Sequence, residues 1–196
     1  MSAQPKHEFI TPEEYLARDR AAKFKSEYFS GEMVAAPLVG FRHESIATNL
    51  AAELGRALRH KACRPRATSN LRVKVRSSGF VYPDALVFCG EPDLVDDGYL
   101  DTLKNPSVLL DVLSPSTELS DHPHKAAWYE AIPSVAHYVF IAQDKVRVEV
   151  YTRQENGDWM KHVESTLDGV MRLPAIGVEI ALSDLYEDTG VVEETG

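Results

Sequence analysis

The sequence lacks the features that mark several large classes of protein. It has only two cysteines, Cys63 and Cys89, and no C-x-x-C pattern, so we expect reduced thiols and neither a disulfide nor a zinc site. No apolar run approaches the roughly 20 residues that cross a bilayer, and the start has no signal-peptide core. Walker loops, G-x-G-x-x-G and nucleophile elbows are also missing. We therefore expect a cytoplasmic protein with no membrane partner.

The composition is that of one ordinary globular domain. The chain has 196 residues, of which 44% are hydrophobic and 26% are charged, and domains usually hold roughly 100–200 residues. We expect an N-terminal extension over residues 1–10, one domain over residues 11–186, and an acidic, frayed tail over residues 187–196.

Helix and strand signals alternate along this domain. Thr11 and Glu14 form a capping box around Pro12, which predicts a helix start. The remaining signals predict a hairpin at Ser30-Gly31, an amphipathic helix from His43 to about His60, a hairpin of Leu71–Arg76 with Phe80–Phe88, a buried strand over Ser107–Leu113, a helix near Ser120–Ile132 and further strands. This order predicts an α/β or α+β sandwich around one central sheet.

Basic residues are concentrated in one segment of an acidic protein. The net charge is −9, yet Arg56 to Arg76 holds eight basic residues and no acid. Such a stripe suits a phosphate backbone, and a solvated basic strand edge explains it equally well. The residues that we expect to contact nucleic acid are Arg56, Arg59, Arg72, Lys74 and Arg76.

Two aspartates lie among apolar residues of predicted strands. Asp111 interrupts the apolar run Val108–Leu113, and Asp84 follows Pro83 at the start of another apolar run. An ionised carboxylate without a partner in such a place would cost several kcal/mol. One explanation is that Asp84 caps a turn and Asp111 pairs with a buried cation.

A divalent metal ion is the other explanation, because it accounts for both aspartates together. Two like charges ~4 Å apart repel by about 4 kcal/mol at an effective dielectric near 20. Mg²⁺ removes this repulsion, and it needs only one or two carboxylates beside water and substrate phosphate. The sequence therefore predicts Mg²⁺, or Mn²⁺ in its place, between Asp84 and Asp111.

Three further polar residues are candidates for the same site. Lys125 shares a helix face with Trp128 and Tyr129, so it either meets an anion or extends its ammonium to solvent. Glu27 is either an auxiliary metal or water contact or a solvated acid. His43, alone at a helix start, is more typical of a structural hydrogen bond than of a ligand.

The order of these motifs resembles that of the Uma family of restriction-endonuclease-like proteins, a branch of the PD-(D/E)-x-K nuclease superfamily. The resemblance runs from about Thr11 to Tyr186. Its motifs are Ser-Glu27-Tyr with Gly31-Glu32, His43 with Asn49-Leu50, Tyr82-Pro83-Asp84, Leu110-Asp111-Val112-Leu113-Ser114-Pro115-Ser116-Thr117, Lys125 with Tyr129, and Val148-Glu149-Val150-Tyr151.

The resemblance implies a restriction-endonuclease-like fold, with a mixed central sheet flanked by helices, and a homodimer. It implies Asp84 and Asp111 as Mg²⁺ ligands, with the carbonyl of Val112 as a further one, Glu27 as an auxiliary acid and Lys125 as the catalytic lysine. The superfamily pattern places lysine where this chain has Leu113, so in this family the lysine has moved to the following helix.

The activity implied is metal-dependent hydrolysis of phosphodiester bonds in DNA by an endonuclease. The net charge of −9 and the lack of a separate DNA-reading domain also fit a catalytically inactive binding module with the same fold. A hydrolase that acts on another phosphate ester is a third interpretation.

Overall fold

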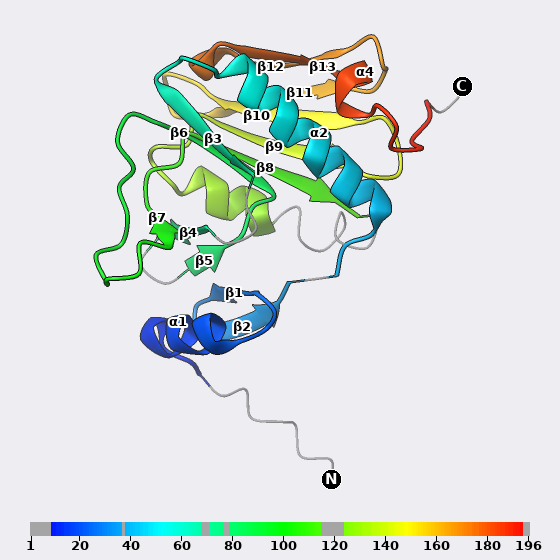
Figure 1. Ribbon diagram of the computed structural model, residues 1–196. Coiled ribbons are helices and arrows are strands. Elements are labelled where there is room, and N and C mark those ends of the chain that lie inside the picture. Colours follow the sequence, from blue (N-terminus) through cyan, green and yellow to red (C-terminus); the bar gives the residue numbers. More distant parts are fainter. Residues whose placement is uncertain (1–8, 37, 68–70, 77–78, 115–123, 194–196) are drawn as a thin grey trace.

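The computed structural model describes residues 9–36, 38–67, 71–76, 79–114 and 124–193. In these ranges the chain forms two β-sheets, a separate hairpin and the helices that cover them (Figure 1).

A mixed six-stranded sheet forms the centre of the protein. Its strands are β3 (Cys63–Ala67), β6 (Ala85–Cys89), β8 (Val108–Leu113), β9 (His137–Ala142), β10 (Val148–Arg153) and β11 (Trp159–Glu164). Their order is β11-β10-β9-β8-β6-β3, and only the β8–β9 pair is parallel. Every residue of β8 is buried, as expected of an apolar run covered on both faces.

A second, five-stranded sheet carries the N-terminal part of the chain. Its strands are β1 (Ser26–Phe29), β2 (Glu32–Ala35), β4 (Arg72–Val75), β5 (Gly79–Val81) and β7 (Thr102–Leu103). Their order is β2-β1-β5-β4-β7, with β4 and β7 parallel. The prediction of one central sheet is therefore incomplete, because the strands split between two sheets.

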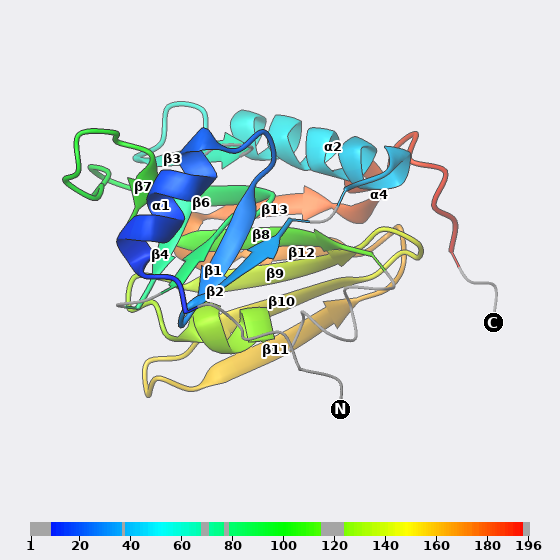
Figure 2. The same cartoon turned by 90° about the horizontal axis from the view of Figure 1, so that it is seen from below.

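The two sheets and the helices make layers around two apolar clusters (Figures 1 and 2). The remaining elements are α1 (Pro12–Ala21), α2 (Phe41–Ala57), a helix over residues 124–130, the hairpin β12 (Val170–Leu173) with β13 (Val178–Ala181), the short helix η1 (Pro174–Ile176) between them, and α4 (Leu182–Leu185). One face of the six-stranded sheet packs on α2, the β12–β13 hairpin and α4. The other face packs on the five-stranded sheet and the helix over residues 124–130. This arrangement confirms the mixed sheet flanked by helices.

The N-terminal elements follow their local sequence signals. Thr11 caps α1 through a capping box with Glu14, and Pro12 occupies its first turn. Ser30 (φ 45°) and Gly31 (φ 101°) make the turn between β1 and β2, where left-handed backbone favours glycine. Both predictions are confirmed. No helix in the described ranges is long and apolar enough to cross a bilayer.

The predicted strand Phe80–Phe88 is wrong as a single element. The chain instead leaves the five-stranded sheet after Val81 and enters the six-stranded sheet at Ala85. Pro83 lies in the gap and has no N–H to donate to a sheet ladder. This break carries Asp84 to the junction of the two sheets.

The cysteines are also not as predicted. Cys63 and Cys89 form a disulfide. They are opposite each other in the antiparallel pairing of β3 with β6. Their 26-residue separation in the sequence shows no motif, so only the strand pairing reveals the bond.

The described part of the C-terminal segment packs against the domain, where the sequence predicted frayed chain. Thr189 and Val191 are buried, and Val191 belongs to the apolar cluster under α2. Asn49 Nδ2 donates to the carbonyl of Glu187 at 2.8 Å. The segment is acidic in composition, and for this reason its composition does not indicate that Val191 packs into the apolar cluster.

His137 is fully buried between β9, β10 and η1. Its Nε2 accepts the N–H of Ala175 at 3.1 Å, so the ring proton is on Nδ1, which lies 3.0 Å from Thr152 Oγ1. Burial lowers the pKa of His137 from 6.5 to about 4. Protonating the ring would also cost the bond from Ala175, so the folded state requires a neutral imidazole.

We predict that acid destabilises the protein through His137. The unfolded chain takes up this proton near pH 6.5 and the folded chain only near pH 4, so this contribution is complete above pH 6.5 and is lost as the pH falls from 6.5 to 4. The loss corresponds to about 3 kcal/mol. Urea unfolding at several pH values measures it. His137→Gln should flatten this part of the profile, whereas the control His162→Gln, at an exposed site, should keep it. Equal slopes in both variants would contradict the prediction.

Candidate active site

Asp84 and Asp111 come together from neighbouring strands of the six-stranded sheet. β6 and β8 pair antiparallel with Ala85 opposite Leu110, and continuing this register by one residue puts Asp84 opposite Asp111. Opposite residues of an antiparallel pair point to the same face. The N–H of Val112 donates to Asp84 Oδ2 at 2.8 Å, which fixes the Asp84 carboxylate beside β8.

Asp111 is buried and has two partners on the helix over residues 124–130. Lys125 Nζ lies 2.7 Å from Asp111 Oδ1, and the hydroxyl of Tyr129 donates to Asp111 Oδ2 at 2.5 Å. Lys125 and Tyr129 are four residues apart and share one face of this helix. The pairing of Asp111 with a buried cation, one of the two explanations offered by the sequence, is thus present in the structure.

Glu27 reaches the same place from the five-stranded sheet. Its Oε1 lies 3.4 Å from Lys125 Nζ and accepts the N–H of Tyr82 at 3.1 Å. Tyr82 has left its own sheet at this point, so Glu27 satisfies a backbone donor at the break before Pro83. The structure therefore brings Glu27, Asp84, Asp111 and Lys125 into one site, as the sequence predicted.

His43 is a site residue whose role the sequence did not reveal. It lies in the first turn of α2, is buried, and its Nε2 is 3.1 Å from Asp84 Oδ2. Its Nδ1 has no hydrogen-bond partner among the described residues. Tyr129 was also missed as a contact of Asp111. The spacing of Tyr129 from Lys125 was the available signal, and no comparable signal linked His43 to Asp84.

The site concentrates charge in a buried setting. Burial raises the pKa of Asp111, as does the nearby charge of Asp84, while Lys125 and Tyr129 oppose the rise. Burial lowers the pKa of Lys125, but Asp111, Tyr129 and Glu27 together outweigh it, so this pKa ends well above its ordinary value. Lys125 is therefore a fixed positive charge between the carboxylates of Asp111 and Glu27.

The pKa of His43 moves in the same direction as that of Lys125. Burial is the largest influence and lowers it, but the hydrogen bond and the charge of Asp84 outweigh burial and raise it overall. Asp84 therefore favours the charged imidazolium at its side.

The donor atoms suit a hard divalent cation such as Mg²⁺. Asp84 is part-exposed, and its Oδ1 accepts no hydrogen bond from the described residues. Within those residues no group of three His, Cys, Asp or Glu side chains could hold a metal, so this is no closed protein cage. Mg²⁺ characteristically binds one or two carboxylates and keeps several waters. Asp84 and Asp111 meet that requirement.

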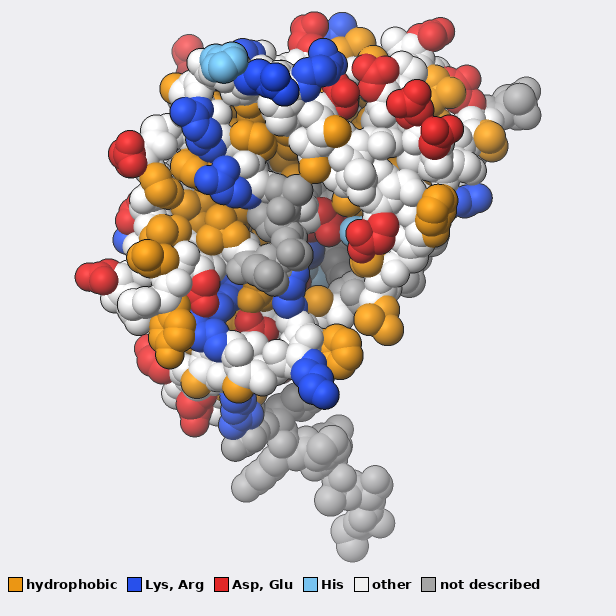
Figure 3. Space-filling view, in the orientation of Figure 1, with side chains coloured by type: hydrophobic (Ala, Val, Ile, Leu, Met, Phe, Trp, Pro, Cys, Tyr) orange, Lys and Arg blue, Asp and Glu red, His pale blue; other side chains and the backbone are white. Residues whose placement is uncertain are grey.

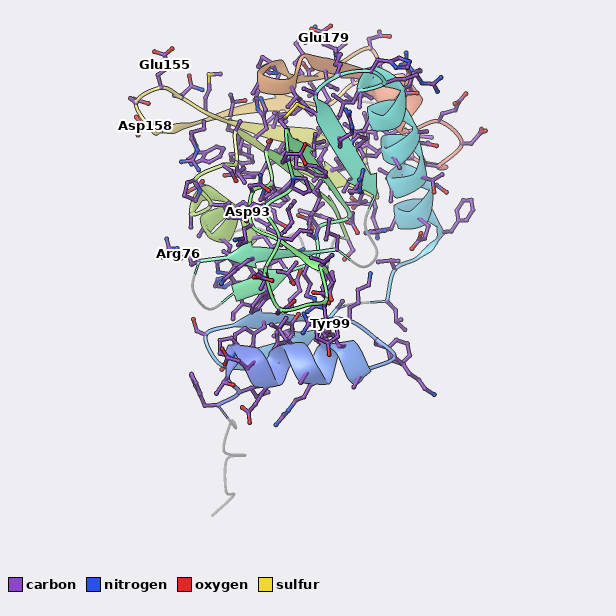
Figure 4. The ribbon with its side chains drawn as sticks, turned by 60° about the vertical axis from the view of Figure 1, so that its left-hand side comes forward. Arg76, Asp93, Tyr99, Glu155, Asp158 and Glu179 are labelled. Atoms are coloured by element: carbon purple, nitrogen blue, oxygen red, sulfur yellow. A yellow bond between two sulfur atoms is a disulfide. The ribbon has the colours of Figure 1, made fainter. Side chains whose placement is uncertain are left out.

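The predicted nucleic-acid contacts do not form one continuous stripe. Arg72 is buried and pairs with Asp101 and Asp19, so its assignment as a DNA contact is wrong. Arg56 is on α2, where it pairs with Glu53. Figure 4 shows Arg76 at the opposite side of the molecule from α2. The strand alternation that predicted an outward Arg72 failed because both faces of β4 are covered.

Two proteins of Synechocystis sp. (strain ATCC 27184 / PCC 6803 / Kazusa) are similar to this chain in sequence. "Uncharacterized protein slr1290" is 27% identical over 178 residues, which cover 90% of this chain and 91% of that protein. "Uncharacterized protein sll1609" is 30% identical over 152 residues, which cover 77% and 85% of the two chains.

A solved structure has the same fold. It is the crystal structure of "a putative nuclease belonging to DUF820" from Anabaena variabilis ATCC 29413, with a TM-score of 0.72 and 20% sequence identity. The match covers 90% of this chain and 97% of the other. This likeness confirms the predicted fold class. The profile of the Uma2 family, described as "Putative restriction endonuclease", matches residues 12–183, and the chain belongs to this family.

Proposed function

We propose that this protein is a Mg²⁺-dependent endonuclease that hydrolyses phosphodiester bonds in DNA. The observation that carries the proposal is the meeting of Asp84, Asp111 and Lys125, which come from two strands and a helix. Two carboxylates can hold a metal ion, and a fixed ammonium beside them can stabilise charge on the phosphate that this ion polarises. Membership of a restriction-endonuclease-like family supports the same chemistry.

The metal ligands of this proposal are the carboxylates of Asp84 and Asp111 and the carbonyl of Val112. In an extended strand the N–H and C=O of one residue face the same neighbouring strand. Because the N–H of Val112 faces Asp84, its carbonyl faces the same side. When bound, the Mg²⁺ ion would lower the pKa of a water molecule and polarise the phosphate.

Lys125 supplies the electrostatic part of catalysis. Asp111 and Glu27 hold its ammonium at 2.7 Å and 3.4 Å. An ammonium held in advance stabilises charge that develops on the phosphate without reorganising during the reaction. Glu27 is the auxiliary acid that positions this ammonium.

His43 and Tyr129 act as positioning residues for the two aspartates. His43 holds Oδ2 of Asp84, and Oδ1 accepts no hydrogen bond from the described residues. The hydroxyl of Tyr129 holds Oδ2 of Asp111. Asp84 is thus held through Oδ2 alone, whereas Asp111 is held through both oxygens, by Lys125 and by Tyr129.

The DNA would lie along the exposed basic residues near β3. Figure 3 shows basic side chains gathered over this part of the molecule, above a hollow. Arg64 and Arg66 are opposite Phe88 and Leu86 of β6, so they project from the same face of the sheet as Asp111. Arg59 at the end of α2 extends the surface. Lys74 and Arg76 remain predicted contacts on the other sheet, and Arg56 remains one beside Arg59.

A homodimer and a cytoplasmic location stay predictions that derive from the sequence. Light scattering gives the mass of the particle in solution and so tests the first. A mass of one chain at working concentration would contradict the homodimer.

We predict Mg²⁺-dependent nicking of supercoiled plasmid DNA. Asp84→Asn should abolish it, because it removes a charged ligand of the metal ion. Lys125→Met should slow it by roughly 10²–10³-fold, because it removes the ammonium that stabilises charge on the reacting phosphate. Asp158→Asn is the matched control, since Asp158 lies at the β10–β11 turn, away from the site (Figure 4).

Three outcomes would contradict the proposal in different ways. Absence of Mg²⁺-dependent nicking, or nicking unchanged in Asp84→Asn, removes the nuclease. DNA binding that persists in Asp111→Asn without any cleavage indicates a catalytically inactive binding module. Competition of free nucleotides with plasmid cleavage indicates a hydrolase of another phosphate ester.

Mg²⁺ should also stabilise the folded protein. A ligand that binds only the folded state raises the free energy of unfolding by about 2.7 kcal/mol at 100 times its dissociation constant. We expect thermal unfolding to shift upward with Mg²⁺ in the parent and in Asp158→Asn, and to stay constant in Asp84→Asn. A shift of equal size in Asp84→Asn would show that Mg²⁺ binds elsewhere.

A further inference from the structure

One face of β1 is directed at the helix over residues 124–130, which carries Lys125. Side chains alternate along a strand, and Ser26 and Tyr28 are buried on the side of α1, where Tyr28 stacks on Tyr15. The opposite side carries Lys25, just before the strand, then Glu27 and Phe29.

Glu27 and Phe29 both contact the helix over residues 124–130. Phe29 stacks on Trp128, with ring centroids 3.4 Å apart. Glu27 lies 3.4 Å from Lys125 Nζ. The first member of the row, Lys25, lies over the ring of Tyr82. The carbonyl of Lys25 accepts the N–H of Ala36, so the hairpin fixes its backbone as well.

Lys25 lies beside the chain break that carries Asp84, and its amine faces an aromatic ring. Its Nζ is 5.2 Å from the centroid of the Tyr82 ring, two residues before Asp84 in the chain. Burial lowers its pKa, and the charges of Asp84, Asp19 and Glu44 oppose this. Lys25 forms no ion pair with any carboxylate in the described ranges.

The contrast with Lys125 indicates what Lys25 can do. Lys125 is committed to Asp111 and Glu27. Lys25 is half-buried and faces an aromatic ring, and it can bind an anion from solvent without breaking an ion pair to any residue that the structure describes.

We propose that Lys25 binds a backbone phosphate of the DNA next to the one that is cleaved. The proposal rests on the proposed function and adds a substrate contact from the N-terminal hairpin. Lys25 contributes a charge-assisted hydrogen bond to a non-bridging phosphate oxygen. The hairpin that delivers Glu27 thereby also holds the DNA strand.

Binding of a labelled DNA duplex in EDTA, where no Mg²⁺-dependent cleavage occurs, tests this contact by itself. We compare the parent with Lys25→Met, Lys25→Arg and the control Lys23→Met, which removes an exposed lysine of the same segment. Each phosphate contact contributes about 0.9 to the slope of log K against log salt. Lys25→Met should reduce the slope by about 1 and weaken binding by roughly fivefold to tenfold near 0.1 M salt.

Two further variants distinguish a phosphate contact of Lys25 from a structural role of this residue. Lys25→Arg should restore the slope, and Lys23→Met should leave it unchanged. In plasmid cleavage Lys25→Met should raise KM and leave kcat unchanged, because this contact is the same before and during bond breaking. Circular dichroism melting of each variant monitors folding.

The outcomes distinguish this proposal from the proposed function. A salt slope in Lys25→Met equal to that of the parent, with plasmid nicking intact, overturns the Lys25 contact and leaves the nuclease. The slope change without any nicking by the parent supports the contact and overturns the nuclease. Failure of the parent to bind the duplex overturns both.

Discussion

The burial of Asp111 is the constraint on which the rest of the site depends. Its carboxylate is on a strand covered on both faces, where an ionised group without partners would not be stable. Lys125 and Tyr129 supply these partners from one helix face. That requirement fixes the helix against the sheet, and the stacking of Trp128 on Phe29 then ties the helix to the N-terminal hairpin.

The N-terminal hairpin is held in turn by a buried network of charges. Asp19 of α1 accepts the N–H of Ser26 and the hydroxyl of Tyr82, and Arg72 pairs with Asp101 beneath them. Arg20 of α1 binds Asp101 as well, at 2.8 Å. An arginine that the sequence assigned to DNA thus supports the hairpin that carries Glu27. The site lies where two sheets meet, and this network holds α1 against β1 and β4 of the five-stranded sheet.

The sequence predicted most elements of the fold, and it singled out residues that the structure brings together, because these depend on local signals. The capping box at Thr11, the turn at Gly31 and the lone Asp111 in an apolar run each have a direct physical meaning. Other features arise only from contacts between distant segments. The pairing of His43 with Asp84, the disulfide between Cys63 and Cys89, the burial of Arg72 and the packing of Val191 all require knowledge of which strands and helices are neighbours.

A double-mutant cycle between Asp111 and Lys125 tests the central claim most directly. The quantity measured is the free energy of unfolding in urea without divalent ions, for the parent, Lys125→Met, Asp111→Asn and the double variant. Lys125→Met alone should cost about 3–5 kcal/mol, because it leaves a buried carboxylate without its cation. The double variant should then recover much of this loss, which gives a large coupling energy. Additive effects of the two substitutions would contradict the account, since they would mean that Asp111 does not depend on Lys125.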